Sequence, residues 1–201
     1  MDSRDRILDA AARVMSTRGF ARSTTKEIAA EAGYSEPMLY KHFASKSALF
    51  LAVLHERMPS FAPLVRELTE APGERPVRER LAAIARAGIA LYLESFPMSA
   101  SMFAEPGLLA AHRDEMARLN AGPHRPVTAV EQYLRAEQRG GRIAAGVDCA
   151  GAAALLVGAC FQYAFLCCFE GCQPDVAELD AYATSITDVL LVGLCARKGE
   201  A

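Results

Sequence analysis

The stretch from residue 22 to residue 46 concentrates basic, hydroxyl and aromatic side chains. At about 100° per residue, a short helix whose Leu39 faces inward presents Pro37 and Lys41 outward. Such a face suits the major groove of DNA, where lysine contacts guanine or phosphate and apolar groups contact thymine methyls. Tyr40 lies on the flank of this face and is placed to donate its hydroxyl to a phosphate oxygen. The stretch therefore predicts a DNA-binding site.

Helix starts in the same stretch add groups that suit phosphate. Free backbone N–H groups at a helix beginning at Thr24 or Thr25 attract anions, and Ser45-Lys46 repeats this arrangement with an ammonium added. For each hydroxyl taken singly, the alternative that it only caps a helix stays open. The residues that we predict to lie at DNA are Arg22, Thr24, Thr25, Lys26, Ser35, Glu36, Pro37, Met38, Tyr40, Lys41, His42 and Lys46.

Three short helices are expected to position these groups. The second helix turns Ile28, Ala29 and Ala32 inward and ends at Gly33, which can adopt the positive φ of a tight turn. Ser35 is expected to cap the next helix and Ser45 the one after it. Helix, turn and helix over about residues 25–44 form the arrangement of a helix-turn-helix motif.

These residues resemble a known family. The matching motifs are Arg18-Gly19-Phe20, then Thr24-Thr25-x-x-Ile28-Ala29-x-x-Ala32-Gly33-x-Ser35, then Leu39-Tyr40-x-His42-Phe43-x-Ser45-Lys46-x-x-Leu49. They are similar to the amino-terminal domain of TetR-type (TetR/AcrR) transcriptional regulators. The resemblance implies a homodimeric, ligand-responsive repressor on a short palindromic operator, with activation as an open alternative. It also implies DNA contacts for Thr24, Thr25, Tyr40, Lys41, His42 and Lys46.

Two positions depart from the family pattern. Met38 stands where the family often has a small or hydroxylated residue, and Pro37 where it often has glycine or alanine. Because these side chains face outward on the expected recognition helix, we expect an operator sequence particular to this protein.

Composition predicts an all-α protein. Of 201 residues, 52% are hydrophobic and 7% aromatic, and tryptophan is absent, whereas strands favour aromatic and β-branched residues. The net charge is −2, but residues 1–57 carry nine basic and seven acidic side chains, which makes this part +2. Prolines and glycines mark a break near residues 60–75. We expect a three-helix DNA-binding domain over residues 1–60 and a larger helical effector-binding and dimerisation domain over residues 61–201.

Helical patterns continue beyond the break. They span about Val77–Ser95, Leu108–Leu119, Val127–Arg139, Ala150–Phe169 and Leu179–Leu194, with Pro97 expected to interrupt the first and Asp148 to cap the fourth. The segment Cys149–Phe169 has 21 residues without a charge, long enough to span a bilayer, but it lacks Trp, Arg or Lys anchors at its ends. We therefore expect an interface helix and no membrane, with a membrane-associated helical protein as the alternative.

Pairing the last two helices with those of a second chain would cover their apolar surface by two-fold symmetry. The residues expected at this dimer interface are Ala154, Leu155, Gly158, Phe161, Gln162, Phe165, Tyr182, Ile186, Val189 and Leu190. A pocket for a small hydrophobic effector is expected among the central helices. Its candidate residues, for each of which ordinary core packing is the alternative, are Leu91, Tyr92, Phe96, Met98, Met102, Phe103, Leu108, His112, Tyr133, Phe161, Gln162 and Phe165.

Cysteines offer a second regulatory hypothesis. Cys168 and Cys172 are four residues apart and share one face if the helix continues, and with Cys160 and Cys167 they would form a thiol sensor or a soft-metal site. The alternative is that these cysteines are small buried hydrophobic residues.

Other function classes lack their sequence signatures. We find no phosphate loop, no Gly-x-Ser-x-Gly, no His-Glu-x-x-His and no dinucleotide glycine pattern, so we expect no enzyme, cofactor or metal. The first residues show no cationic segment followed by an apolar one. We therefore expect no secretory signal, a cytoplasmic protein and reduced thiols.

Overall fold

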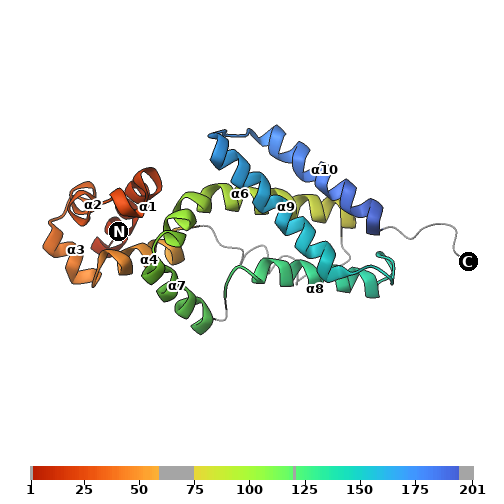
Figure 1. Ribbon diagram of the computed structural model, residues 1–201, viewed down its shortest axis with the longest axis horizontal. Helices are drawn as coiled ribbons and strands as arrows, with labels where there is room; N and C mark the ends of the chain where they lie inside the picture. Colours follow the sequence, from red (N-terminus) through yellow and green to blue (C-terminus); the bar gives the residue numbers. More distant parts are fainter. Residues whose placement is uncertain (1, 59–74, 120, 195–201) are drawn as a thin grey trace, which may run out of the picture. The chain divides into compact units, whose positions relative to one another are not determined.

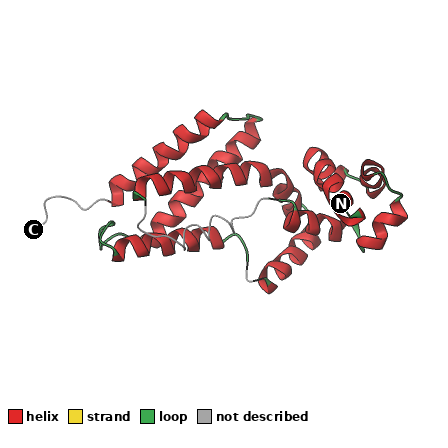
Figure 2. Ribbon diagram, turned by 180° about the vertical axis from the view of Figure 1, so that it is seen from behind, coloured by secondary structure: helices red, strands yellow, loops and turns green. Residues whose placement is uncertain are grey.

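The computed structural model describes residues 2–58, 75–119 and 121–194, and within these ranges it contains helices and loops but no strand (Figures 1 and 2). The expected all-α fold is confirmed. The helices of the described residues are α1 (Ser3–Arg22), α2 (Thr25–Ala32), α3 (Glu36–His42), α4 (Lys46–Glu56), α6 (Val77–Phe103), α7 (Pro106–Arg118), α8 (Arg125–Arg139), α9 (Cys149–Glu170) and α10 (Val176–Leu194).

The described residues form two compact units. Unit 1 contains residues 2–58 and 94–119, and unit 2 contains residues 75–93 and 121–194. Helix α6 therefore contributes its residues up to Leu93 to unit 2 and those from Glu94 to unit 1. The functional division expected at residue 60 stays a proposal, and most of the break expected at residues 60–75 lies outside the described residues.

Unit 1 is built around apolar side chains at helical spacing. From α1, Ile7, Leu8 and Met15 are fully buried, and they pack with Ile28 of α2 and Phe50 of α4 in one core. This packing supplies the stability that helices as short as α2 and α3 lack on their own in water. The same core contains Met98, Met102 and Leu108, which come from α6 and α7.

Side-chain caps begin three of the helices as expected. Thr24, rather than Thr25, caps α2: its hydroxyl accepts from the backbone N–H of Glu27, while the Glu27 carboxylate accepts from the backbone N–H of Thr24. Such a reciprocal capping box satisfies two otherwise unpaired donors. Ser45 caps α4 and Asp148 caps α9 through their side-chain oxygens. Ser35 precedes α3, but its side chain makes no capping bond.

A glycine sets the turn between α2 and α3. Gly33 adopts the left-handed conformation (φ 75°, ψ 30°), and its backbone N–H donates to the Ala30 oxygen at 3.0 Å. A side chain at this position would be strained, because L-residues rarely adopt this conformation. The turn predicted at Gly33 is thus confirmed.

Helix α6 differs from the prediction. It was expected to end near Ser95, before Pro97, but it continues to Phe103 with Pro97 inside it. Proline removes one backbone hydrogen bond and disfavours the helix locally, yet a helix can tolerate it when packing secures the following turn. Here that turn carries Met98 and Met102, which are 0% and 7% exposed in the core of unit 1.

Unit 2 packs α9 against α8 and α10. The core includes Leu81 and Ile89 of α6, Leu134 of α8 and Leu156 of α9. Helices α6 and α9 approach closely at Gly88, where a Cβ atom would lie 3.6 Å from the sulfur of Cys160. Ion pairs from α6 to α10 join Arg78 to Asp188 and Arg86 to Asp180 on the surface of the same unit.

Candidate nucleic-acid interface

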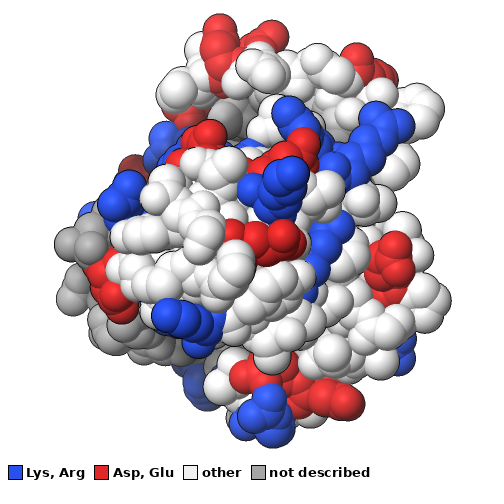
Figure 3. All heavy atoms as spheres, turned by 90° about the vertical axis from the view of Figure 1, so that its left-hand side faces the viewer, with Lys and Arg blue, Asp and Glu red and all other residues white. Residues whose placement is uncertain are grey.

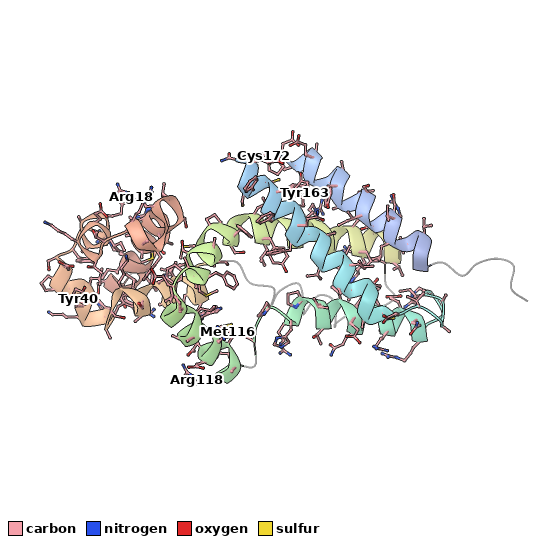
Figure 4. All side chains as sticks on the ribbon, in the orientation of Figure 1. Arg18, Tyr40, Met116, Arg118, Tyr163 and Cys172 are labelled. Atoms are coloured by element: carbon pink, nitrogen blue, oxygen red, sulfur yellow. The ribbon has the colours of Figure 1, made fainter. Side chains whose placement is uncertain are left out.

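The geometry of α3 places its polar side chains outward. Leu39 is fully buried and Phe43, just after the helix, is 5% exposed, whereas Pro37 and Lys41 are exposed and Tyr40 is 48% exposed. The inward and outward faces predicted for this helix are confirmed, except that Met38 is half-buried. Figure 4 shows Tyr40 projecting from α3, and Figure 3 views the chain from the side on which α2 and α3 lie in Figure 1, with Lys and Arg beside Asp and Glu.

Three predicted contact residues bond to one another across the turn. The Thr25 hydroxyl donates to a Glu36 carboxylate oxygen at 2.5 Å, and it lies 3.3 Å from the Tyr40 hydroxyl. Because the single proton of Thr25 is engaged by Glu36, Tyr40 is the donor in the second bond. The bonds link α2 to α3. Thr25 itself is buried, at 9% exposed, so of the three residues Tyr40 is the exposed one, and Glu36 is partly buried.

The start of α2 divides its polar groups between capping and solvent. Thr24 is committed to the capping box with Glu27, and Arg18 pairs with the same carboxylate at 2.6 Å. Bonds from Thr24, with a smaller contribution from Arg18, lower the pKa of Glu27. Arg22 and Lys26 have exposed side chains nearby in the chain. The start of α2 thus keeps two exposed cations for an anionic ligand, while Thr24 acts as a cap.

Two further predicted residues have protein partners in this structure. A nitrogen of the His42 ring (Nε2) lies 2.9 Å from the Ser3 hydroxyl of α1. The Lys46 ammonium lies 4.3 Å from the centre of the Phe20 ring, and burial lowers its pKa. The contact of Ser3 with His42 could not be predicted, because no local pattern links residues 39 positions apart.

Ion pairs fix α1 against the carboxyl end of α4. Arg57 donates to Asp9 at 2.6 Å and to Asp5 at 2.7 Å, and Arg4 donates to both carboxylate oxygens of Glu56 at 2.6 and 2.8 Å. A guanidinium that donates two bonds holds its partner in a defined orientation. These pairs, together with the apolar core, position α2 and α3 relative to the helices that carry them.

A comparison with known families decides the class of this motif. Residues 7–53 match the family model described as bacterial regulatory proteins, tetR family. The amino-terminal helices of the chain therefore match the TetR family. The matched residues run from α1 into α4 and include α2, the Gly33 turn and α3, so the family match covers the geometry described above.

Curated relatives share the amino-terminal part of this chain. The HTH-type transcriptional activator FasR of Mycolicibacterium smegmatis is 37% identical over 86 residues, which is 43% of this chain and 38% of FasR. The uncharacterized HTH-type transcriptional regulator YdgC of Bacillus subtilis is 41% identical over 70 residues, 35% of this chain and 34% of YdgC. The chain thus matches only about a third of the length of these curated relatives.

Solved structures resemble nearly the whole chain in fold. A TetR-family transcriptional regulator from Mesorhizobium loti is 22% identical, with a TM-score of 0.77 over 96% of this chain and 97% of that chain. The regulator FadR from Bacillus subtilis, solved in complex with stearoyl-CoA, is 18% identical, with a TM-score of 0.67 over 95% of this chain and 99% of that chain. At these identities the likeness shows the fold.

The candidate effector residues fall into both units. Met98, Met102 and Leu108 are buried in the core of unit 1, whereas Tyr133 is buried in the core of unit 2. In unit 1, Phe103 is 68% exposed. The rest are partly buried or exposed: Phe96 and His112 in unit 1, and Leu91, Tyr92, Phe161, Gln162 and Phe165 in unit 2. The core packing of the first four matches the alternative named for them, and the pocket stays a prediction.

In unit 2, Tyr92 and Phe161 make an edge-to-face contact, with ring centres 5.3 Å apart. Burial raises the pKa of Tyr92 to about 12, so its hydroxyl stays protonated at neutral pH. A protonated hydroxyl beside an aromatic ring is an amphipathic surface of the kind that small apolar ligands use.

The candidate dimer residues separate by helix. On α9 the expected positions face outward: Leu155 is 69% exposed, and Ala154, Gly158, Phe161, Gln162 and Phe165 are also exposed. On α10, Val189 is 74% exposed, but Tyr182, Ile186 and Leu190 are partly buried against the core of unit 2. The outward positions on α10 also include Val192, 81% exposed, which sequence analysis did not single out.

The thiols of α9 do not form one cluster. Cys167 contacts Cys172 at the carboxyl end of α9, near Tyr163 (Figure 4), whereas Cys160 donates to the Ala85 oxygen from a buried site. Burial raises the pKa of Cys167 to about 11 and that of Cys160 to about 12, which lowers the reactive thiolate fraction. Thiol sensing stays a hypothesis that these pKa shifts disfavour. No group of three or more His, Cys, Asp or Glu placed to hold a metal occurs among the described residues.

Proposed function

We propose that this chain is a DNA-binding transcriptional regulator of the TetR type. It would act in the cytoplasm as a homodimeric repressor and leave a palindromic operator when a small hydrophobic effector binds. The observation that carries the proposal is the α2–α3 motif. Leu39 and Phe43 are buried in the core of unit 1, whereas Lys41 and Tyr40 are exposed on the opposite side. A helix of this size with an outward cationic and hydroxyl-bearing face fits the major groove.

The apolar side chains that α9 and α10 leave exposed support a homodimer. Leu155, Phe169, Val189 and Val192 are between 69% and 81% exposed, and large apolar patches of this kind mark interfaces in soluble proteins. A second copy would cover the patch by two-fold symmetry and would duplicate α3. Two copies of α3 could then contact half-sites about 34–36 Å apart on one face of the duplex.

A membrane is the competing occupant of that surface. Helices α6 and α9 are long and apolar enough to cross a bilayer by length and composition alone. Against this, Ala153, Leu156 and Cys160 of α9 are buried in the core of unit 2, so one side of the helix already packs on protein. Recovery of the purified chain in detergent-free buffer supports the dimer, and a strict need for detergent contradicts it.

The effector proposed is a small hydrophobic compound. Support comes from the partly exposed apolar and aromatic side chains of unit 2, such as Tyr92 and Phe161, and from FadR of similar fold, which was solved with stearoyl-CoA. Binding would favour a state of the dimer whose recognition helices no longer match the spacing of the groove.

The test begins with selection of bound duplexes from a random DNA pool by the full-length chain. We expect an enriched palindrome, and Lys41→Ala should weaken binding to every duplex and reduce the salt slope by about one. Arg139→Ala, which removes an exposed cation of α8, serves as the matched control and should leave both unchanged. Selection without enrichment, or equal salt slopes for Lys41→Ala and wild type, would contradict the proposal.

A reporter gene placed behind the selected palindrome tests the sign of regulation. Expression that falls when the chain is supplied supports repression. Expression that rises would identify an activator that uses the same motif.

A further inference from the structure

Two histidines that are far apart in the sequence face each other in unit 1. His55 lies on α4 and His112 on α7, the helix that Met116 and Arg118 mark in Figure 4. Nε2 of His55 and Nδ1 of His112 are 3.4 Å apart, with ring centres 5.5 Å apart and planes inclined by 34°. Both rings are partly buried, so they are held by packing and still reachable from solvent.

The 3.4 Å separation is long for a hydrogen bond and also equals the spacing of two nitrogens bound to one metal ion. An N–H donor usually lies about 2.9–3.0 Å from its acceptor. Two nitrogens bound at about 2.0–2.1 Å to one tetrahedral Zn²⁺ are about 3.3–3.4 Å apart along the edge of the tetrahedron. Burial lowers the pKa of both His55 and His112, which favours neutral rings whose lone pairs can bind a metal.

Neighbouring acids are already engaged by arginines. Glu56, next to His55, accepts two bonds from Arg4, and Glu115, one turn from His112 on α7, pairs with Arg118. The described residues therefore supply two ligands here, both imidazoles, and water or a small anion would complete the coordination. Imidazole ligands select Zn²⁺, Cu²⁺ or Ni²⁺ over the oxygen-seeking Mg²⁺ and Ca²⁺.

We propose that His55 and His112 form a two-histidine site for a divalent transition metal, with Zn²⁺ as the ion of first choice, and that the bound ion joins α4 to α7. Because α4 begins at Lys46, just after the recognition helix, the ion would act on the helix that supports the DNA-binding face. The site needs only the contact between these two helices, and it gives His112, also a candidate effector residue, a different role.

Zn²⁺ alone, added to the full-length chain after removal of metals with a chelator, tests the site. The wild type should bind Zn²⁺ with an unfolding midpoint raised by about 2–5 °C, because a ligand that binds only the folded state stabilises it. His55→Gln and His112→Gln should each lose most of this shift relative to their own metal-free midpoints. His124→Gln changes an exposed histidine and is the matched control, which should keep the shift.

The wild type and the three variants contain the same thiols, so any shift of the unfolding midpoint from Zn²⁺ bound at cysteines is common to all four proteins. Equal shifts in all four proteins, or no shift in the wild type, would overturn the proposal. If a glutamine variant fails to fold, the side-chain NMR signals of the wild type decide. Zn²⁺ should move the ring signals of His55 and His112 and leave those of His42 and His124 in place, and the reverse pattern would end the proposal.

Discussion

At the residue scale, the most informative group of the DNA-binding face is a carboxylate. Glu36 lies among groups expected to meet phosphates, and it accepts the proton of Thr25 at 2.5 Å. In the proposed complex its negative charge would oppose the approach of DNA, while its bond to Thr25, which also contacts the Tyr40 hydroxyl, would order both hydroxyls beforehand. A carboxylate can also accept a bond from the cytosine amino group in the major groove. In the proposed complex, Glu36 would therefore lower the general affinity for DNA and help to select its sequence.

Glu36→Gln separates these two effects. The amide keeps an oxygen that can accept from Thr25 but removes the charge, so binding to an unrelated duplex should tighten by about 2–5-fold at low salt. Fluorescence anisotropy with labelled duplexes measures the change. Glu79→Gln, at an exposed acid of α6, is the control and should bind as the wild type does. Unchanged or weaker binding of the unrelated duplex by Glu36→Gln would contradict this role.

At the element scale, the structure shows which helix ends depend on side chains. Helix α2 has a complete capping box from Thr24 and Glu27, whereas Ser35 at the start of α3 makes no capping bond. The two positions look alike in the sequence, because both are hydroxyl residues that precede a short helix. Their contributions to stability should therefore differ despite the similar pattern.

Thr24→Ala should lower the free energy of unfolding by about 1 kcal/mol at pH 7, and Ser35→Ala should change it by less than about 0.5 kcal/mol. Urea unfolding followed by circular dichroism measures both. The bonds from Thr24 lower the pKa of Glu27, so this stabilisation is present above the ordinary pKa of a glutamate and is lost as pH falls through the lowered value. The gap between wild type and Thr24→Ala should shrink in acid by the part that the Glu27 carboxylate contributes, while the bond from the Glu27 backbone N–H to Thr24 remains. A gap of undiminished size at pH 2 would contradict the role given to this carboxylate.

Local patterns account for the parts of the fold that sequence analysis predicted. Leu39, Ile28 and Gly33 follow from helical spacing and from the need for a positive φ, and both signals lie within a few residues. The extension of α6 past Pro97 and the contact between His55 and His112 depend on packing between segments far apart in the chain. No local pattern encodes such contacts. The end of α6 was therefore predicted too early, and the contact between the two histidines was not predicted.

At the scale of the whole molecule, the exposed apolar faces of α9 and α10 are the feature to explain. On α9, Leu155, Phe165 and Phe169 follow one another at helical spacing on one side, while the opposite side is buried in unit 2. The described chain thus presents a two-sided helix with only one side covered. The proposed second copy would cover the other.

Native mass spectrometry of the purified chain should show a dimer, and any additional mass would characterise a co-purified effector. Leu155→Arg places a charge in the proposed interface and should shift the protein to monomer, because a buried unpaired charge is costly. Leu119→Arg, at an exposed leucine of unit 1, should remain dimeric. A dimeric Leu155→Arg protein would place the interface elsewhere.

The paired arginines at the end of α4 have a mechanical consequence. Arg57 pairs with Asp5 and Asp9, and Arg4 pairs with Glu56, so two sets of ion pairs join α1 to the end of α4 beside their shared apolar core. We therefore expect a displacement of α4 at His55 to move α1 and α4 together and not to bend α4 alone. If α3 lies in the proposed groove, a small rotation of α1 and α4 together would move α3, and with it Lys41, along the DNA.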